Sequence, residues 1–123
     1  SSPRRQRQMC IRDRIKSHYT ENTRFYNVMN SGIDEFKTLE EEFAQFDQYM
    51  ETFEIMNIRE SGLPDVLDYE GDGAVVISWI EMTFKNKKSG NIGTILQHIQ
   101  HSFNEEGEIM REDYYFNPAQ LPQ

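Results

Sequence analysis

The sequence predicts a single α+β domain in which a curved antiparallel sheet wraps around N-terminal helices. Apolar residues recur every three or four positions in the first half of the chain, and they alternate with polar residues between repeated turn signals in the second half. A helix followed by a run of strands is typical of a sheet that is covered on one face by helices. The length of 123 residues fits one domain.

The first predicted elements are a strand and a long helix. Residues 23–29 (TRFYNVM) are rich in β-forming side chains and precede a turn, so we expect a strand there. Ser31 and Asp34 have the spacing of a capping box, with Asp in place of the usual Glu, and this predicts where the helix begins. The other face of the helix is acidic, and its apolar face comprises Ile33, Phe36, Leu39, Phe43, Phe46, Met50 and Phe53.

Strands are predicted throughout the second half of the chain. Turn-forming residues recur there, and the segments between them have the alternating pattern of half-buried strands. We expect the three longest strands to be joined by hairpins into an antiparallel meander. The predicted strands lie near 53–59, 65–70, 74–85, 92–103 and 108–116.

Charge is unevenly distributed along the chain. Residues 1–14 carry five Arg and one Asp, a net charge of +4, whereas residues 15–123 carry eight basic and 20 acidic groups, a net charge of −12. An acidic surface repels phosphate backbones and anionic lipid, so we expect no nucleic-acid partner and no membrane attachment. No apolar run approaches the roughly 20 residues that span a bilayer.

Motifs for several kinds of chemistry are missing from the sequence. Cys10 is the only cysteine, which excludes an intrachain disulfide and fits a reducing compartment, so we expect a cytoplasmic protein. There is no glycine-rich phosphate loop, G-x-S-x-G or H-E-x-x-H motif, and we expect no cofactor. His98 and His101 would point to opposite faces of a strand, so no metal site is expected.

The first 14 residues differ in character from the rest. The segment QMCIRDR (8–14) resembles the translated sequencing-adapter read-through found in metagenomic gene models, and its charge opposes that of the remaining chain. We interpret residues 1–14 as a non-native head, 15–121 as the domain and 122–123 as a tail. On this interpretation the native N-terminus is truncated and lacks one or two core elements. The alternative, a basic arm for nucleic acid, is disfavoured by the acidic body.

Three segments resemble the closing half of SnoaL-like proteins, a branch of the nuclear transport factor 2-like superfamily. The segments are GDGAVVISW (71–79), TFKNKKSGN (83–91) and HSFNEEGEIMREDYYFNPAQL (101–121), and their order and spacing carry a resemblance that covers residues 20–121. It implies a cone-shaped domain whose concave sheet and helices enclose a largely apolar pocket. Dimerisation through the sheet is common among such relatives, so we expect a homodimer.

The resemblance does not specify a reaction. Members of this family include polyketide cyclases, isomerases, epoxide hydrolases, dehydratases and non-catalytic binding proteins. Two positions depart from the usual pattern, since Glu108 stands where relatives usually have Lys, and Asn117 lies near the Asp that often closes the last strand. An amide does not titrate, so Asn117 could not replace that Asp as a base.

Strand 92–103 places polar residues on an apolar face. Gln97 and His101 share that face with three large apolar residues, Ile95, Ile99 and Phe103. A polar group on a core-facing side needs a partner, because leaving it without one costs about 1–3 kcal/mol. We therefore expect a partner for His101 on the following strand.

The hairpin loop decides which residue that partner is. A three-residue loop with Gly107 in the left-handed conformation would place His101 opposite Arg111 and diagonally beside Asp113. A four-residue loop would make Glu112 the diagonal neighbour. We favour the first arrangement because it requires glycine at position 107.

These positions predict an acid–base site. His101 would be the base and Asp113 its orienting carboxylate, in a pocket lined by Trp79, Gln97, Ile99, Arg111 and Tyr115. Proton abstraction next to a carbonyl, or activation of water, would be the corresponding reactions. The alternative is a structural one, in which His101 merely bonds Asp113 or Arg111 within a polar patch of the sheet.

Two functions remain open from the sequence. The first is a pocket protein that binds a small apolar molecule with a carbonyl or hydroxyl group, with acid–base chemistry of the isomerase, cyclase or hydratase type. The second is a non-catalytic dimerisation or interaction module that uses the exposed sheet. Turnover with a bell-shaped pH dependence would favour the first.

Overall fold

The computed structural model describes residues 2–71 and 73–123, which form three α-helices and six strands. The helices are α1 (Pro3–Lys16), α2 (Val28–Ser31) and α3 (Leu39–Thr52), and a short 3-10 helix, η1 (Pro118–Gln120), lies near the C-terminus. The strands are β1 (Tyr19–Asn27), β2 (Phe53–Glu60), β3 (Asp65–Tyr69), β4 (Gly73–Asn86), β5 (Ile92–Phe103) and β6 (Ile109–Tyr115).

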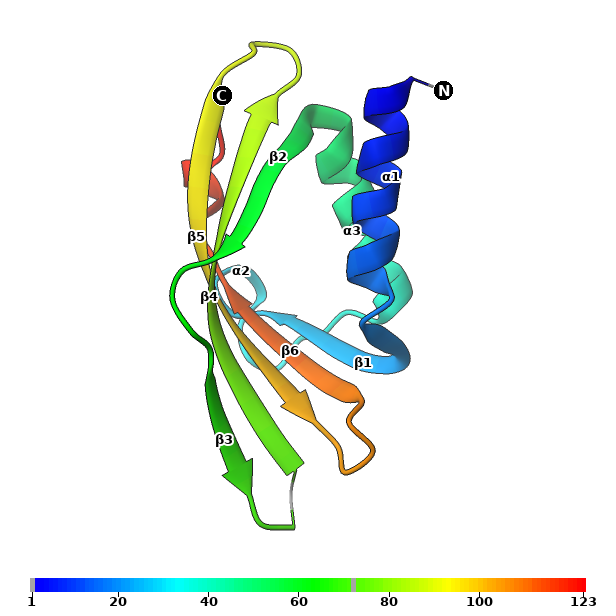
Figure 1. Cartoon of the computed structure of the whole chain (residues 1–123), viewed down its shortest axis with the longest axis vertical. Coiled ribbons are helices and arrows are strands. Elements are labelled where there is room, and N and C mark those ends of the chain that lie inside the picture. The colour runs from blue at the N-terminus through cyan, green and yellow to red at the C-terminus, as the bar shows by residue number, and fades with distance from the viewer. Residues whose placement is uncertain (1, 72) are drawn as a thin grey trace.

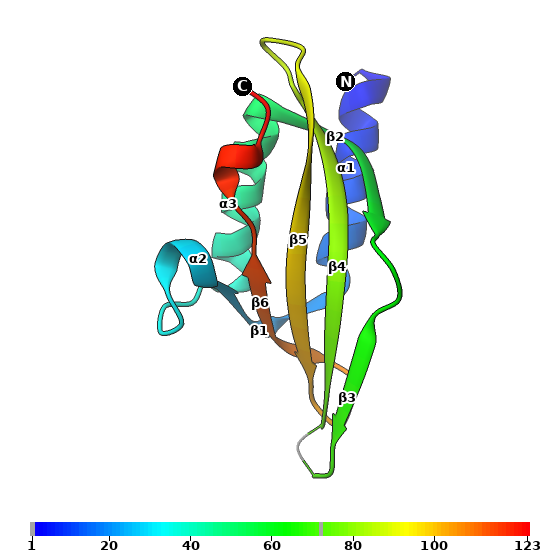
Figure 2. The ribbon, with the colours of Figure 1, turned by 90° about the vertical axis from the view of Figure 1, so that its left-hand side faces the viewer.

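The strands form one curved, unclosed sheet in the order β1-β6-β5-β4-β2, with β3 also paired to β4. The first part of β4 pairs with β3 and the rest pairs with β2, so the two short strands follow each other along one edge. All pairs are antiparallel except β1–β6, which is parallel. Helices α1 and α3 lie on the concave side (Figure 1), and Figure 2 views the sheet from the opposite side. The predicted α+β class is confirmed.

The predicted strands of the second half are all present with nearly the predicted bounds. The reason is that their alternating pattern and the turn residues between them act locally. The hairpin between β4 and β5, for example, is closed by Asn86, whose side chain accepts hydrogen bonds from the backbone N–H groups of Lys88 (2.9 Å) and Ser89 (3.2 Å).

The predicted start of the long helix is wrong. Helix α3 begins after Thr38, whose hydroxyl accepts a hydrogen bond from the Glu41 N–H, while the Glu41 carboxylate accepts one from the Thr38 N–H. This capping box replaces the one expected at Ser31, because the backbone of Lys37 pairs with that of Phe25 on β1 in both directions (2.8 and 3.0 Å). The segment before residue 38 is therefore held extended, outside the helix.

Two residues assigned to the apolar face of the helix consequently lie outside it. Ile33 and Phe36 are 65% and 44% exposed. The Phe36 ring is covered instead by the guanidinium group of Arg24, 4.5 Å from the ring centroid. Their spacing therefore predicted a helical face to which neither residue belongs, since α3 begins at Leu39.

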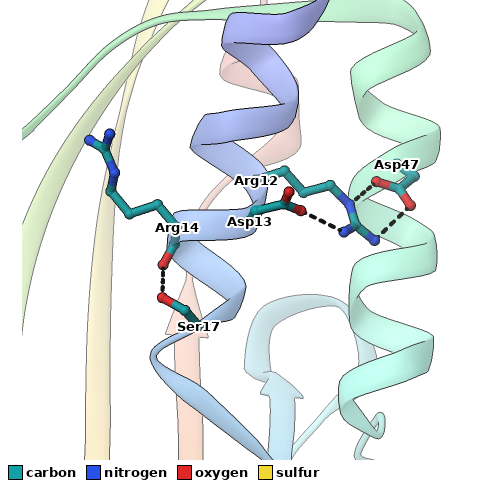
Figure 3. Close-up of polar contacts among 5 residues, drawn as sticks. All are labelled: Arg12, Asp13, Arg14, Ser17 and Asp47. Carbon is teal, nitrogen blue, oxygen red and sulfur yellow. Dashed lines mark hydrogen bonds and ion pairs between the residues drawn. The ribbon is translucent and has the colours of Figure 1, made fainter.

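Helix α1 contains residues 3–14 of the segment that we interpret as a non-native head, and it continues through Ile15 and Lys16 of the domain. The Gln8 side chain bonds both the N–H and the C=O of Ile55 at 3.0 Å, and so occupies part of the edge of β2. Arg12 binds the Asp47 carboxylate of α3 through two hydrogen bonds of 2.6 and 3.1 Å (Figure 3). The helix has no buried residue. The interpretation of its origin stays a prediction.

The core lies between the helices and the concave face of the sheet. One group of buried side chains comes from β2, β4 and β5 and comprises Ile55, Met82, Phe84 and Ile95. A second group joins β1, α3 and β6 and comprises Phe25, Phe43 and Tyr114. Among the described residues, no helix has the length and apolar character needed to cross a membrane.

Candidate functional site

A cavity of about 260 Å³ separates helix α3 from the concave face of the sheet. This is slightly below the roughly 300 Å³ at which small-molecule pockets usually begin. Most of its wall is aromatic or aliphatic, and the lining residues include Phe43, Phe46, Phe53, Phe84 and Phe116. The cavity is therefore suited to a small molecule with a largely apolar surface.

Two hydrogen-bonded groups of side chains include the carboxylates of this wall. In the first, Glu112 of β6 accepts a short hydrogen bond from the Tyr19 hydroxyl of β1, and its Oε1 lies 2.7 Å from His101 Nε2. The Tyr19 hydroxyl is also 3.3 Å from His101 Nε2, so the three side chains form a triangle. In the second, the Tyr114 hydroxyl donates to Glu42 of α3 at 3.3 Å.

The hairpin between β5 and β6 brings Glu112 to this position. The loop contains Gly107 at φ +80°, as expected, and the Asn104 N–H donates to the Glu108 carbonyl at 3.0 Å. Beyond the loop the pairing shifts by one residue, so that Phe103 pairs with Ile109 but Ser102 pairs with Arg111. This β-bulge leaves one residue of β6 without an opposite partner.

The bulge overturns the predicted register around His101. His101 lies directly opposite Glu112, not opposite Arg111, and Asp113 pairs with Gln100. Because neighbouring residues of a strand point to opposite faces, a shift of one residue exchanges the side chains on each face. Glu112 thus faces the concave side, and the prediction that Asp113 orients His101 is wrong.

Asp113 and Arg111 form a separate pair on the convex face. The Arg111 Nε and one terminal nitrogen bind the Asp113 carboxylate at 2.9–3.1 Å. The guanidinium group also lies 3.8 Å from the centroid of the Tyr26 ring. The hydrogen bond to Asp113 raises the pKa of Arg111, so this carboxylate is neutralised within its own pair.

The predicted pocket residues divide between the two faces of the sheet. Gln97 and Ile99 line the cavity, as expected from their place on β5. Trp79 and Tyr115 lie on the convex face with Arg111, where Trp79 packs on His98 (ring centroids 4.3 Å apart) and His98 on Tyr115 (5.4 Å). Trp79 is 48% exposed.

His101 lies on the concave side but behind the cavity wall. Its side chain is 20% exposed and borders a neighbouring hollow of about 370 Å³ with His18, Phe103 and Ile109. It reaches the main cavity through Glu112 and Tyr19. In this geometry Glu112 is the group that lines the cavity, and His101 contacts it from behind.

Burial alters the acid–base properties of this end of the cavity. Burial, and then the negative charge of Glu112, raises the pKa of Glu42 above its ordinary value. Burial also raises the pKa values of Tyr19 and Tyr114. The second cause is the negative charge of Glu112 for Tyr19 and that of Glu42 for Tyr114. Both phenols therefore stay protonated at neutral pH and act as hydrogen-bond donors to the carboxylates.

Sequence reasoning missed most of these residues. Tyr19 precedes the predicted first strand, and Tyr114 is not among the predicted site residues. Glu42 belonged to the acidic face of the predicted helix. Its spacing from Leu39 and Phe46, three and four residues away, was the available signal, because that spacing places it near the apolar stripe. Glu112 entered only as the diagonal neighbour in the alternative register.

Within residues 2–71 and 73–123, His, Cys, Asp and Glu side chains nowhere gather in threes in a way that could hold a metal ion. The cavity instead has the features of a binding site for an organic molecule, namely an apolar wall and a few convergent polar groups.

Comparisons with known proteins give similarity in structure alone. No protein-family model matches the sequence, and a search of curated proteins finds no match. A protein from Mesorhizobium loti designated a SnoaL-like polyketide cyclase superposes with a TM-score of 0.62 at 17% identity, over 88% of this chain and 87% of the other. A ketosteroid isomerase-like protein from Erwinia carotovora atroseptica gives 0.66 at 15% identity, over 89% and 83%.

An NTF2-like protein from Cytophaga hutchinsonii is similar over 89% of this chain and 85% of its own length, with a TM-score of 0.56 at 14% identity. All three similarities extend along most of both chains, so they concern the complete arrangement of helices and sheet and not one motif. The chain therefore has the nuclear transport factor 2-like fold that its closing segments resemble.

Proposed function

We propose that this chain binds a small, largely apolar molecule with a carbonyl or hydroxyl group in the cavity, and that Glu112 acts on it as an acid–base group. The observation that carries the proposal is the position of Glu112. Its side chain is 9% exposed, lies on a mostly apolar cavity wall, and is held by Tyr19 and His101. A carboxylate held in this way is pre-organised for proton transfer.

The proposed chemistry is of the isomerase, cyclase or hydratase type. Glu112 would accept a proton from a carbon next to a carbonyl, or from a water molecule, and return it at another position. Tyr19 and His101 would hold the carboxylate in place and adjust its basicity as the proton moves. Two structurally similar proteins bear the names polyketide cyclase and ketosteroid isomerase-like protein, which refer to apolar carbonyl compounds.

Binding in the cavity is tested first with acetophenone, a small neutral ketone. In an NMR titration we expect shifts of amide resonances from residues that line the cavity. Ile99→Trp would fill the cavity and should abolish the shifts. Leu96→Trp is the matched control, because Leu96 lies on the same strand but is 46% exposed and outside the cavity wall. Equal binding by both variants would contradict the proposed site.

Acid–base chemistry is tested with the same ketone in deuterated water. We expect the protein to accelerate deuterium incorporation at the methyl group next to the carbonyl. The rate is measured by proton NMR at saturating ketone. A protein that binds the ketone without accelerating exchange would be a binder without the proposed acid–base function. Native electrospray mass spectrometry of the purified chain, searching for a co-purified molecule, would identify the natural ligand.

A second candidate function, self-association through the convex face, is favoured by a specific group of side chains. Trp79 and Leu96 are 48% and 46% exposed there, and the ring of Trp79 packs on His98. An exposed tryptophan surrounded by apolar residues is typical of interfaces. Light scattering should then give the mass of a dimer, and Trp79→Lys should give a monomer. A monomeric parent chain would contradict this candidate.

A further inference from the structure

We infer that the molecule bound in the cavity carries a protonated amine, whose ammonium group is bound by Glu42 and Glu112. The inference rests on the proposed function, because the same cavity is the binding site. It adds that the bound molecule contains a basic nitrogen. The ligand class is thus a small lipophilic amine. Three properties of the cavity wall support this.

The first property is the charge of the wall. Among the described residues that line the cavity, Glu42 and Glu112 are the ones with ionisable acidic or basic groups other than phenols, and none is Lys or Arg. His101 contacts Glu112 from behind the wall. Lys37, whose ammonium group binds the Gln45 side chain, has the smallest of the effects on the pKa of Glu42. The wall is therefore negative on balance.

The second property is the direction of the hydrogen bonds. The Tyr19 hydroxyl donates to Glu112 and the Tyr114 hydroxyl donates to Glu42, so each carboxylate already has a phenol that donates to it. Each carboxylate has further lone pairs, because an ionised carboxylate accepts about four hydrogen bonds. The two carboxylates thus offer acceptors, and a ligand that binds them must supply donors. An ammonium group supplies up to three.

The third property is the aromatic surface next to the carboxylates. The rings of Tyr19, Phe25 and Phe43 lie close together, with centroid distances of 4.9 Å for Tyr19–Phe25 and 6.2 Å for Tyr19–Phe43. Aromatic faces attract cations, most strongly where water is excluded. From outside the cavity, the charged groups of Arg12 and Lys16 already lie over the Phe43 ring at 5.6 and 5.8 Å.

Electrostatics supports the inference independently of these contacts. The charge of Glu112 is close enough to raise the pKa of Glu42, so the two carboxylates repel each other. A bound cation would offset this repulsion. A neutral alcohol of the same shape would not.

The experiment compares two ligands of equal shape, cyclohexylmethylamine and cyclohexylmethanol, by isothermal titration calorimetry at pH 7.5. We expect the amine to bind about tenfold or more tightly, because hydrogen bonds to charged groups contribute more than neutral ones. In the double variant Glu42→Gln, Glu112→Gln the preference should disappear, because the affinity for the amine should fall by more than the affinity for the alcohol. The control variant Glu41→Gln, on the exposed side of α3, should retain the preference.

The outcomes separate this inference from the proposed function. Equal or tighter binding of the alcohol, or a preference for the amine that persists in the double variant, would overturn the inference. Failure of the proposed site gives a different result. Either neither ligand binds the parent chain, or both ligands bind Ile99→Trp as tightly as they bind the parent chain. Circular dichroism of each variant confirms that the fold is intact before any affinity is interpreted.

Discussion

The two faces of the sheet each bury a carboxylate, and they treat it differently. On the convex face Asp113 is bound by the guanidinium group of Arg111 through several hydrogen bonds and is neutralised there. On the concave face Glu112, the preceding residue, has a phenol and a histidine as partners and faces an apolar cavity. The difference indicates that Asp113 has a structural role, whereas Glu112 retains acceptor capacity for a ligand.

The largest expected effect concerns the reaction on the concave face. Glu112→Gln keeps the shape of the side chain but removes the base, so deuterium exchange of acetophenone should slow by about 100-fold or more. Asp113→Asn is the matched control, because it makes the same chemical change one residue away on the other face. Proton NMR measures both rates. If the Asp113 variant loses as much activity as the Glu112 variant, the two faces do not have the separate roles described here.

The next effect concerns stability on the convex face. Arg111→Met removes the cation and leaves Asp113, whose side chain is 11% exposed, without a charged partner. Breaking a buried pair costs about 3–5 kcal/mol, and the 42% exposure of the Arg111 side chain reduces this to about 2 kcal/mol. Urea denaturation measures the loss. Adding Asp113→Asn should recover part of it, and no recovery would show that the pair is not the source.

A smaller effect concerns the hairpin loop between β5 and β6, which precedes the bulge that turns Glu112 inward and Asp113 outward. Gly107 has φ +80°, a conformation that costs a residue with a side chain about 1 kcal/mol. Nothing lies near the position that its Cβ would take, so Gly107→Ala tests the backbone alone. We expect Gly107→Ala to have a lower melting temperature than the parent chain and the same fold. An unaffected melting temperature would mean that the loop does not depend on this conformation.

The smallest effect is a change in melting temperature whose sign should differ between Glu42, on the cavity side of α3, and Glu41, on its exposed side. Burial raises the pKa of Glu42, so the folded chain holds this proton more tightly than the unfolded chain. The resulting stabilisation is present at low pH and is lost as the pH rises through the raised pKa. Ionised Glu42 is therefore unfavourable at neutral pH, and Glu42→Gln should raise the melting temperature at pH 7.5 by more than at pH 4.

The adjacent residue provides the opposite control. The hydrogen bond from the Thr38 N–H, followed by that with its side chain, lowers the pKa of Glu41 below its ordinary value. Its stabilising contribution is present at neutral pH and is lost on acidification. Glu41→Gln should accordingly lower the melting temperature at pH 7.5. Changes of the same sign in both variants would show that the cavity does not penalise the charge of Glu42.

Helix α3 shows how a sequence pattern can mislead. Ile33 and Phe36 continue its apolar spacing towards the N-terminus, and Ser31 with Asp34 has the form of a cap. The structure uses Thr38 with Glu41 instead, because Lys37 pairs its backbone with Phe25 of β1. A capping motif is a local signal, and a contact with a distant strand determined which of two such signals is used.

By itself the sequence determined the fold class, the strands of the second half and the left-handed Gly107, because alternation, helical spacing and turn chemistry act over a few residues. Only the tertiary structure decided which carboxylate meets His101. A bulge of one residue in β6 turned Glu112 inward and Asp113 outward. The tertiary structure also brought Tyr19 of β1 and Glu42 of α3 to the same cavity wall, and such long-range contacts leave no periodic trace in a sequence.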